Sequence, residues 1–232
     1  MGAALGWGVV AASSLVLGAL LGLARQWPDR LIGLVLAFGA GALISAVSFE
    51  LFEDGIAVGG AAAVGIGLAA GALTYFALSR IVEAKLGGGG GPSLALGAFL
   101  DGIPEQLVLG IGIAAGEGVS VSLLIAIFVS NLPEAIGSAT DMRESGAKPF
   151  MIRRLWFLVA GLCALATPAG FAIAENTGGH FNAGVNGFAA GALLVMLVDS
   201  MIPESTSKTG RVAGLATTLG FAVAAGLSTA SA

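Results

Sequence analysis

The segment Phe38-Gly39-Ala40-Gly41-Ala42-Leu43-Ile44 lies in the middle of a predominantly apolar stretch, residues 31–52. A stretch of about 20 apolar residues is long enough to cross a bilayer as a helix. Seven similar stretches occupy the rest of the chain, at 4–24, 56–79, 94–115, 119–140, 151–173, 183–203 and 211–231. The sequence therefore predicts an all-α polytopic membrane protein with eight transmembrane helices.

The overall composition supports this interpretation. Of the 232 residues, 56% are hydrophobic and 10% are charged, whereas a soluble domain carries about 25% charged residues. A net charge of −4 and the lack of a basic cluster argue against nucleic acid as a partner. A lone cysteine, Cys163, excludes an intramolecular disulfide framework. We expect residues 1–232 to form one transmembrane domain in the lipid bilayer of a cytoplasmic (inner) membrane.

The basic residues predict the orientation of the chain. All ten Lys and Arg residues fall in the first, third, fifth and seventh connections between the predicted spans. With eight spans, these four connections share one side of the membrane, which the positive-inside rule assigns to the cytoplasm. Both termini are then expected outside.

The opening segment recurs later in the chain. Phe188-Ala189-Ala190-Gly191-Ala192-Leu193-Leu194 shares five of its seven residues with Phe38–Ile44, at an offset of 150. The two segments cross in opposite directions, which is typical of inverted repeats in transporters. The predicted 3+2+3 arrangement has repeats at 1–81 and 150–232, a central helix pair at 94–141 and a Gly-rich cytoplasmic linker at 82–93. Chance similarity between Gly/Ala-rich helices is the alternative.

Two polar motifs interrupt the central pair. One is Asp101-Gly102-Ile103-Pro104-Glu105 and the other is Ser130-Asn131-Leu132-Pro133-Glu134. Residues four apart share a helix face, and a proline leaves a backbone carbonyl without its donor and bends the helix. We therefore expect a locally unwound, oxygen-rich cation site, with metal ligands Asp101, Glu105, Asn131 and Glu134.

An ionised carboxylate at mid-membrane costs on the order of 3 kcal/mol. The predicted span interiors hold no Lys, Arg or His to compensate the negative charges of Asp101, Glu105 and Glu134. A divalent cation would do so directly. The alternative is that the carboxyl groups are protonated and form hydrogen bonds between helices.

Other acidic residues lie near helix ends and could guide cations across the membrane. We expect Glu50, Glu53 and Asp54 at an outer access site, and Asp199 and Glu204 at an inner exit. This order suits import into the cytoplasm. Ordinary solvated helix ends would account for the same residues.

The paired motifs resemble those of the ZIP (Zrt/Irt-like) divalent metal-ion transporters. The chain as a whole resembles a divergent bacterial-type member of that family. The family's eight spans, outside termini and 3+2+3 arrangement agree with the predicted topology. The resemblance implies import of Zn, Fe, Mn or a similar ion as transported substrate, with no further cofactor. Glu105 and Glu134 match the family's metal-binding glutamates, Asn131 matches a position that is often Asn, and Asp101 stands in place of histidine.

Some positions depart from that family. Gly102 replaces a usual Asn, and Thr167 stands before Pro168 where a two-metal centre often has Glu. Because carboxylates and carbonyls suit harder ions such as Mn²⁺, selectivity is expected to differ. A proton- or sodium-coupled cation exchanger and a non-transporting divergent member stay open as alternatives. An enzyme is not expected. Small-residue faces would permit a homodimer.

Overall fold

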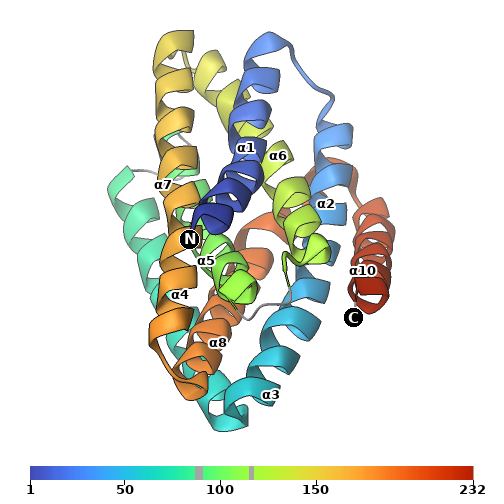
Figure 1. Cartoon of the computed structure of the whole chain (residues 1–232). Coiled ribbons are helices and arrows are strands. Elements are labelled where there is room, and N and C mark those ends of the chain that lie inside the picture. The colour runs from blue at the N-terminus through green and yellow to red at the C-terminus, as the bar shows by residue number, and fades with distance from the viewer. Residues whose placement is uncertain (87–90, 115–117, 232) are drawn as a thin grey trace.

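The computed structural model describes residues 1–86, 91–114 and 118–231, and every element in these ranges is helical (Figure 1). Six long helices are single elements: α1 (Gly2–Ala24), α4 (Ala61–Leu86), α5 (Gly91–Ala114), α6 (Val121–Glu144), α7 (Pro149–Asn176) and α10 (Val212–Ser231). Two longer stretches contain a π-helical segment: α2 (Asp29–Ala46), η1 (Val47–Glu53) and α3 (Asp54–Gly59), then α8 (Gly179–Met196), η2 (Leu197–Met201) and α9 (Ile202–Thr209).

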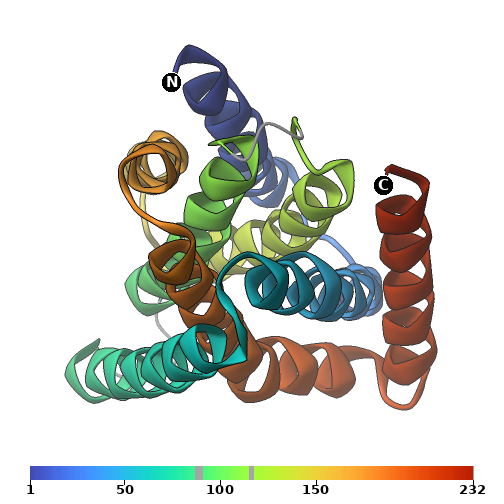
Figure 2. The ribbon, with the colours of Figure 1, turned by 60° about the horizontal axis from the view of Figure 1, so that its bottom comes forward.

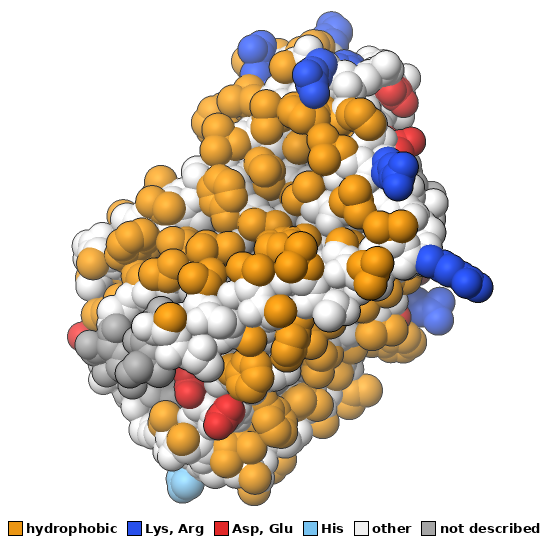
Figure 3. Space-filling model, turned by 90° about the vertical axis from the view of Figure 1, so that its right-hand side faces the viewer, with side chains coloured by type: hydrophobic (Ala, Val, Ile, Leu, Met, Phe, Trp, Pro, Cys, Tyr) orange, Lys and Arg blue, Asp and Glu red, His pale blue; other side chains and the backbone are white. Residues whose placement is uncertain are grey.

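Seven helical stretches in the described ranges are long and apolar enough to cross a membrane. Hydrophobic side chains cover the middle of the face shown in Figure 3, while its Lys and Arg side chains gather toward the upper end and the right edge. The fold is therefore that of an α-helical membrane protein. The long helix outside this set of seven is α5, which carries the polar motif around Asp101 and Glu105.

Some predicted boundaries are wrong. The stretch expected to end at residue 52 stays helical through η1 and α3, and the chain turns at Gly60, whose φ of 88° favours glycine. The stretch expected to end at residue 203 likewise continues to Thr209. Within the predicted linker, residues 82–86 belong to α4 and 91–93 to α5, and residues 87–90 lie outside the described residues.

The helices surround α5. It contacts α1, α4, α6, α7 and α8, and Figure 2 shows it among them. Helices α4 and α10 lie at opposite edges of the bundle, where α4 packs along α8 and α10 packs along α2 (Figure 2). This arrangement buries the polar motif of α5.

Two close helix contacts occur at corresponding places. A Cβ added at Gly71 of α4 would overlap the backbone of Phe188 in α8, and one added at Gly220 of α10 would overlap the backbone of Phe38 in α2. Phe38 and Phe188 are the first residues of the two similar segments. The π-helical segments η1 and η2 also begin 150 residues apart. Glycine at these contacts lets the helix backbones approach closely.

Candidate functional site

The polar motifs of α5 and α6 lie against each other inside the bundle. Asp101 and Glu105 are 2% and 1% exposed, and Ser130 and Asn131 are also buried. The helices α5 and α6 are in contact, and side-chain hydrogen bonds join the two motifs. The structure thus brings together the four residues predicted as metal ligands.

Asp101 lies beside polar side chains from α4 and α6. The Tyr75 hydroxyl of α4 donates to Asp101 Oδ1 over 2.5 Å. The carboxyl groups of Asp101 and Glu134 also lie within hydrogen-bonding reach of each other. A hydrogen bond between two carboxyl groups needs a proton on one of them. The pair can therefore hold a proton, or exchange it for a cation.

Glu105 is held by neutral donors from α6. Asn131 Nδ2 donates to Glu105 Oε2 over 3.0 Å, and the Ser130 hydroxyl lies 3.5 Å from Glu105 Oε1. In the described ranges, the single ion pair joins Lys208 to Glu204, on α9. The three central carboxyl groups therefore have no basic side chain bound to them.

The site is arranged in pairs. Among the described residues, no three His, Cys, Asp or Glu side chains are placed to hold one metal ion together. Asp101 instead pairs with Glu134, while Glu105 pairs with Asn131. Binding a cation between all of them would require these side chains to change partners.

The predicted unwinding at the prolines is wrong. α5 stays α-helical through Pro104, and α6 stays α-helical through Pro133. A proline removes one backbone hydrogen bond, and contacts with neighbouring helices can compensate for this loss so that the chain stays helical. Here α5 packs along both α6 and α7. The irregular helical turns occur instead at η1 and η2.

The sequence interpretation missed two polar residues near the site. Tyr75, which contacts Asp101, is the only tyrosine in the chain, and its place within an apolar span was the available signal. Gln106 follows Glu105 and links three helices. It accepts a hydrogen bond from the Thr167 hydroxyl of α7, and its Nε2 donates to the Gly8 carbonyl of α1 over 3.4 Å.

The residues expected at an outer access site separate into two groups. Glu50 and Asp54 line a cavity bounded by η1, α3, α5, α6 and α8, whereas Glu53 is exposed and does not line it. The Ser120 hydroxyl, at the start of α6, donates to Glu50 Oε2.

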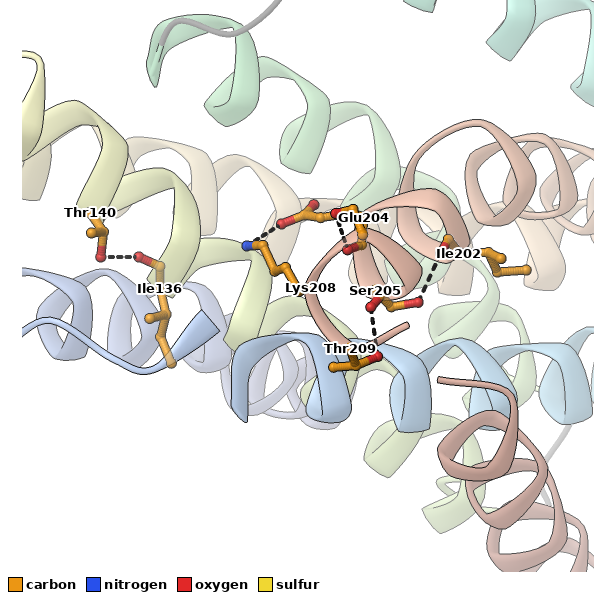
Figure 4. A network of polar contacts seen from close by, with 8 residues as sticks. Ile136, Thr140, Ile202, Glu204, Ser205, Lys208 and Thr209 are labelled. Carbon is orange, nitrogen blue, oxygen red and sulfur yellow. Dashed lines mark hydrogen bonds and ion pairs between the residues drawn. The ribbon is translucent and has the colours of Figure 1, made fainter. Parts of the chain in front are cut away.

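The two residues expected at an inner exit face different neighbours. Asp199 of η2 lines a shallow groove beside α4, together with Phe76. Glu204 Oε1 lies 2.8 Å from Lys208 Nζ one turn along α9, on the side that faces Gly137 of α6 (Figure 4). The structure therefore does not combine Asp199 and Glu204 into one cluster.

Comparison with protein-family models and with curated proteins identified no relative of this chain. No family model matches the chain, and no curated protein matches it. The fold and the site alone define an α-helical membrane protein with a buried group of carboxyl side chains.

Proposed function

We propose that this protein is a secondary transporter that moves divalent metal ions into the cytoplasm, through the carboxylate-rich site between α5 and α6. The observation that carries the proposal is the burial of Asp101 and Glu105 beside the partly buried Glu134, without a basic partner in the described ranges. Carboxyl groups inside a membrane are costly and characteristically mark ion pathways. The resemblance of the two proline-glutamate motifs to those of ZIP transporters supports the same function.

The proposed topology has eight spans and both termini outside. It adds α5, the fourth span in chain order, to the seven long apolar helices. The corresponding contacts of Gly71 with Phe188 and of Gly220 with Phe38 support an inverted repeat of the first and last three spans. The distribution of Lys and Arg supports cytoplasmic odd-numbered connections. The proposed location is a cytoplasmic (inner) membrane.

In this proposal a cation replaces the proton shared by Asp101 and Glu134. Glu105 then turns from Asn131 toward the ion, and Asn131 contributes its amide oxygen as a neutral ligand. Tyr75 orients Asp101 through its hydroxyl. Because all these ligand atoms are oxygens, hard ions such as Mn²⁺ are favoured over ions that prefer imidazole.

Uptake by proteoliposomes tests the function. Purified protein in vesicles would be offered Zn, Mn, Fe, Co and Cd, with protein-free vesicles as the control. We expect uptake of at least one of these ions above the control, with Mn²⁺ among the best substrates. The absence of uptake for every ion, by protein that elutes as a folded species, would contradict the proposal and leave a non-transporting role.

The proximity of the Asp101 and Glu134 carboxyl groups favours a second candidate, a proton- or sodium-coupled cation exchanger that uses the same carboxyl groups. An imposed pH gradient separates the two. Proton flux that needs Na⁺ and no divalent metal selects the exchanger, whereas metal uptake in the absence of Na⁺ selects the metal transporter.

A further inference from the structure

A second polar region lies in the cavity beyond the central site. The cavity has a volume of about 460 Å³ and is bounded by η1, α3, α8, the end of α5 and the start of α6. Val108 of α5 is part of its wall. Since Val108 follows Glu105 by three residues, less than one helical turn along α5 separates the cavity wall from Glu105.

Two helices each place a pair of oxygen-bearing side chains on this cavity. Glu50 and Asp54 come from η1 and α3, and Asn182 and Asn186 come from α8. Members of each pair are four residues apart, so they project from one side of their helix. The helix α8 packs directly on η1 and α3, which sets the two pairs against the same space.

Gly59 of α3 lets these helices approach. A Cβ added at Gly59 would lie 2.5 Å from the Cβ of Ala183 and 2.5 Å from the carbonyl oxygen of Gly179, both on α8. This close packing holds α3 against the helix that carries Asn182 and Asn186.

Two acceptor atoms in this region have no hydrogen-bond partner in the described part of the chain. These are Glu50 Oε1 and Asn186 Oδ1, and both atoms are buried. Asn186 as a whole is only 8% exposed. Leaving a buried acceptor unpaired is energetically unfavourable, and more so for a charged group. A bound group that supplies positive charge would remove this cost.

The charge around the cavity selects the ligand. No Lys, Arg or His is among the described residues that line it, while two carboxylates are. The two unpaired atoms accept and do not donate, so an anion or a neutral acceptor cannot bind to them. A hard cation fits both the charge and the oxygen ligands.

We propose that this cavity is a second cation-binding site, in which Glu50 and Asn186 are ligands of a hard divalent cation and Asp54 adds negative charge. The site is separate from the pair of motifs on α5 and α6. Its role in loading the central site rests on the proposed transport function, whereas the binding itself does not.

Mn²⁺ binding to the full-length protein in lipid nanodiscs tests the site. Electron paramagnetic resonance would count bound Mn²⁺ in a background carrying Glu105→Gln and Glu134→Gln, which disables the central site. We expect about one bound Mn²⁺ per chain to persist. Adding Glu50→Gln should weaken this binding at least about tenfold, because loss of a ligand costs at least as much affinity as loss of a group that only orients one.

Asn186 offers changes in both directions. Asn186→Leu should weaken Mn²⁺ binding, and Asn186→Asp should tighten it, because a carboxylate replaces the amide at the same place. The tighter binding of Asn186→Asp keeps the proposal testable if Asn186→Leu fails to fold. Glu53→Gln is the matched control, since Glu53 is exposed and does not line the cavity.

Mn²⁺ binding that is absent in the disabled background, or that responds equally to Glu50→Gln and Glu53→Gln, would overturn the proposal. Failure here is distinguishable from failure of the transport function. Uptake by the wild-type protein without this extra Mn²⁺ rejects only the second site. The extra Mn²⁺ without uptake supports the second site and rejects transport.

Discussion

Asp101 on α5 and Glu134 on α6 bring their carboxyl groups within hydrogen-bonding reach of each other. Thirty-three positions separate them in the chain, and the packing of α5 on α6 brings them together. One proton between two carboxyl groups is the simplest way to keep such a pair inside an apolar bundle. The same two groups are suited to exchange that proton for a metal ion.

The proton held by this pair should leave when metal binds, because metal ligands must be deprotonated. We expect the wild-type protein to release about one proton per bound Mn²⁺ from the central site. A pH indicator in weakly buffered detergent solution measures the release. Tight binding of Mn²⁺ at the central site without proton release would show that the carboxyl groups are ionised beforehand.

Tyr75→Phe removes the hydroxyl that donates to Asp101 while keeping the ring. Loss of a group that orients a metal ligand commonly lowers metal affinity about tenfold or more. We expect the half-saturating Mn²⁺ concentration for uptake to rise by about this factor, with normal protein yield. Phe76→Leu, at an exposed neighbouring position, is the control. Equal behaviour of the two variants would argue against a role for the hydroxyl.

Gly71→Ala places a Cβ against the backbone of Phe188 and should force α4 and α8 apart. Overpacking of this kind costs about 1–3 kcal/mol. Gly65→Ala is the matched control on the same helix, because nothing lies within 4 Å of its added Cβ. Alanine there should be neutral or stabilising by about 0.5–1 kcal/mol. Thermal unfolding in detergent compares them, and equal losses of stability would contradict the close helix contact.

Gly220→Ala tests the corresponding contact with Phe38 in the same assay. A loss similar to that of Gly71→Ala is expected, because both glycines meet the backbone of a phenylalanine in the partner helix. An unchanged transition temperature for Gly220→Ala beside a lowered one for Gly71→Ala would show that the two contacts are not equivalent.

Lys208→Gln breaks the ion pair with Glu204. The side chain of Lys208 is 21% exposed and that of Glu204 is 35% exposed. Pairs four residues apart on a helix contribute about 0.3–0.5 kcal/mol. We expect a correspondingly small loss of stability that high salt abolishes. Glu204→Gln and the double variant Lys208→Gln/Glu204→Gln complete a double-mutant cycle for this ion pair. A loss above about 2 kcal/mol would be too large for a solvent-screened pair.

Apolar segments predicted an α-helical membrane protein because helix length and hydropathy are local properties. The approximate positions of the long apolar helices follow from them, and Gly60 marks the turn after α3. The continuation of the helix through Glu50 and Asp54 could not be predicted in the same way. These charged residues resemble a helix end in sequence, but packing of η1 and α3 on α8 keeps the chain helical there.

The candidate site was predictable where its residues share a motif. Asp101, Glu105, Asn131 and Glu134 do lie at one helix contact, as the spacing indicates. The contribution of Tyr75 depends on how α4 sits beside α5, and no local pattern encodes that placement. Asn186 was missed for a related reason, since its unpaired oxygen becomes evident only in the folded chain.

The most direct test of the account compares Mn²⁺ uptake by wild-type proteoliposomes with that of Glu105→Gln and Glu134→Gln. Glu175→Gln, at an exposed position, serves as the charge-matched control. The account predicts uptake by the wild type and the control, and a loss of at least about tenfold in both central variants, with folding intact. Uptake that survives both substitutions in folded protein would contradict a carboxylate-centred metal site between α5 and α6.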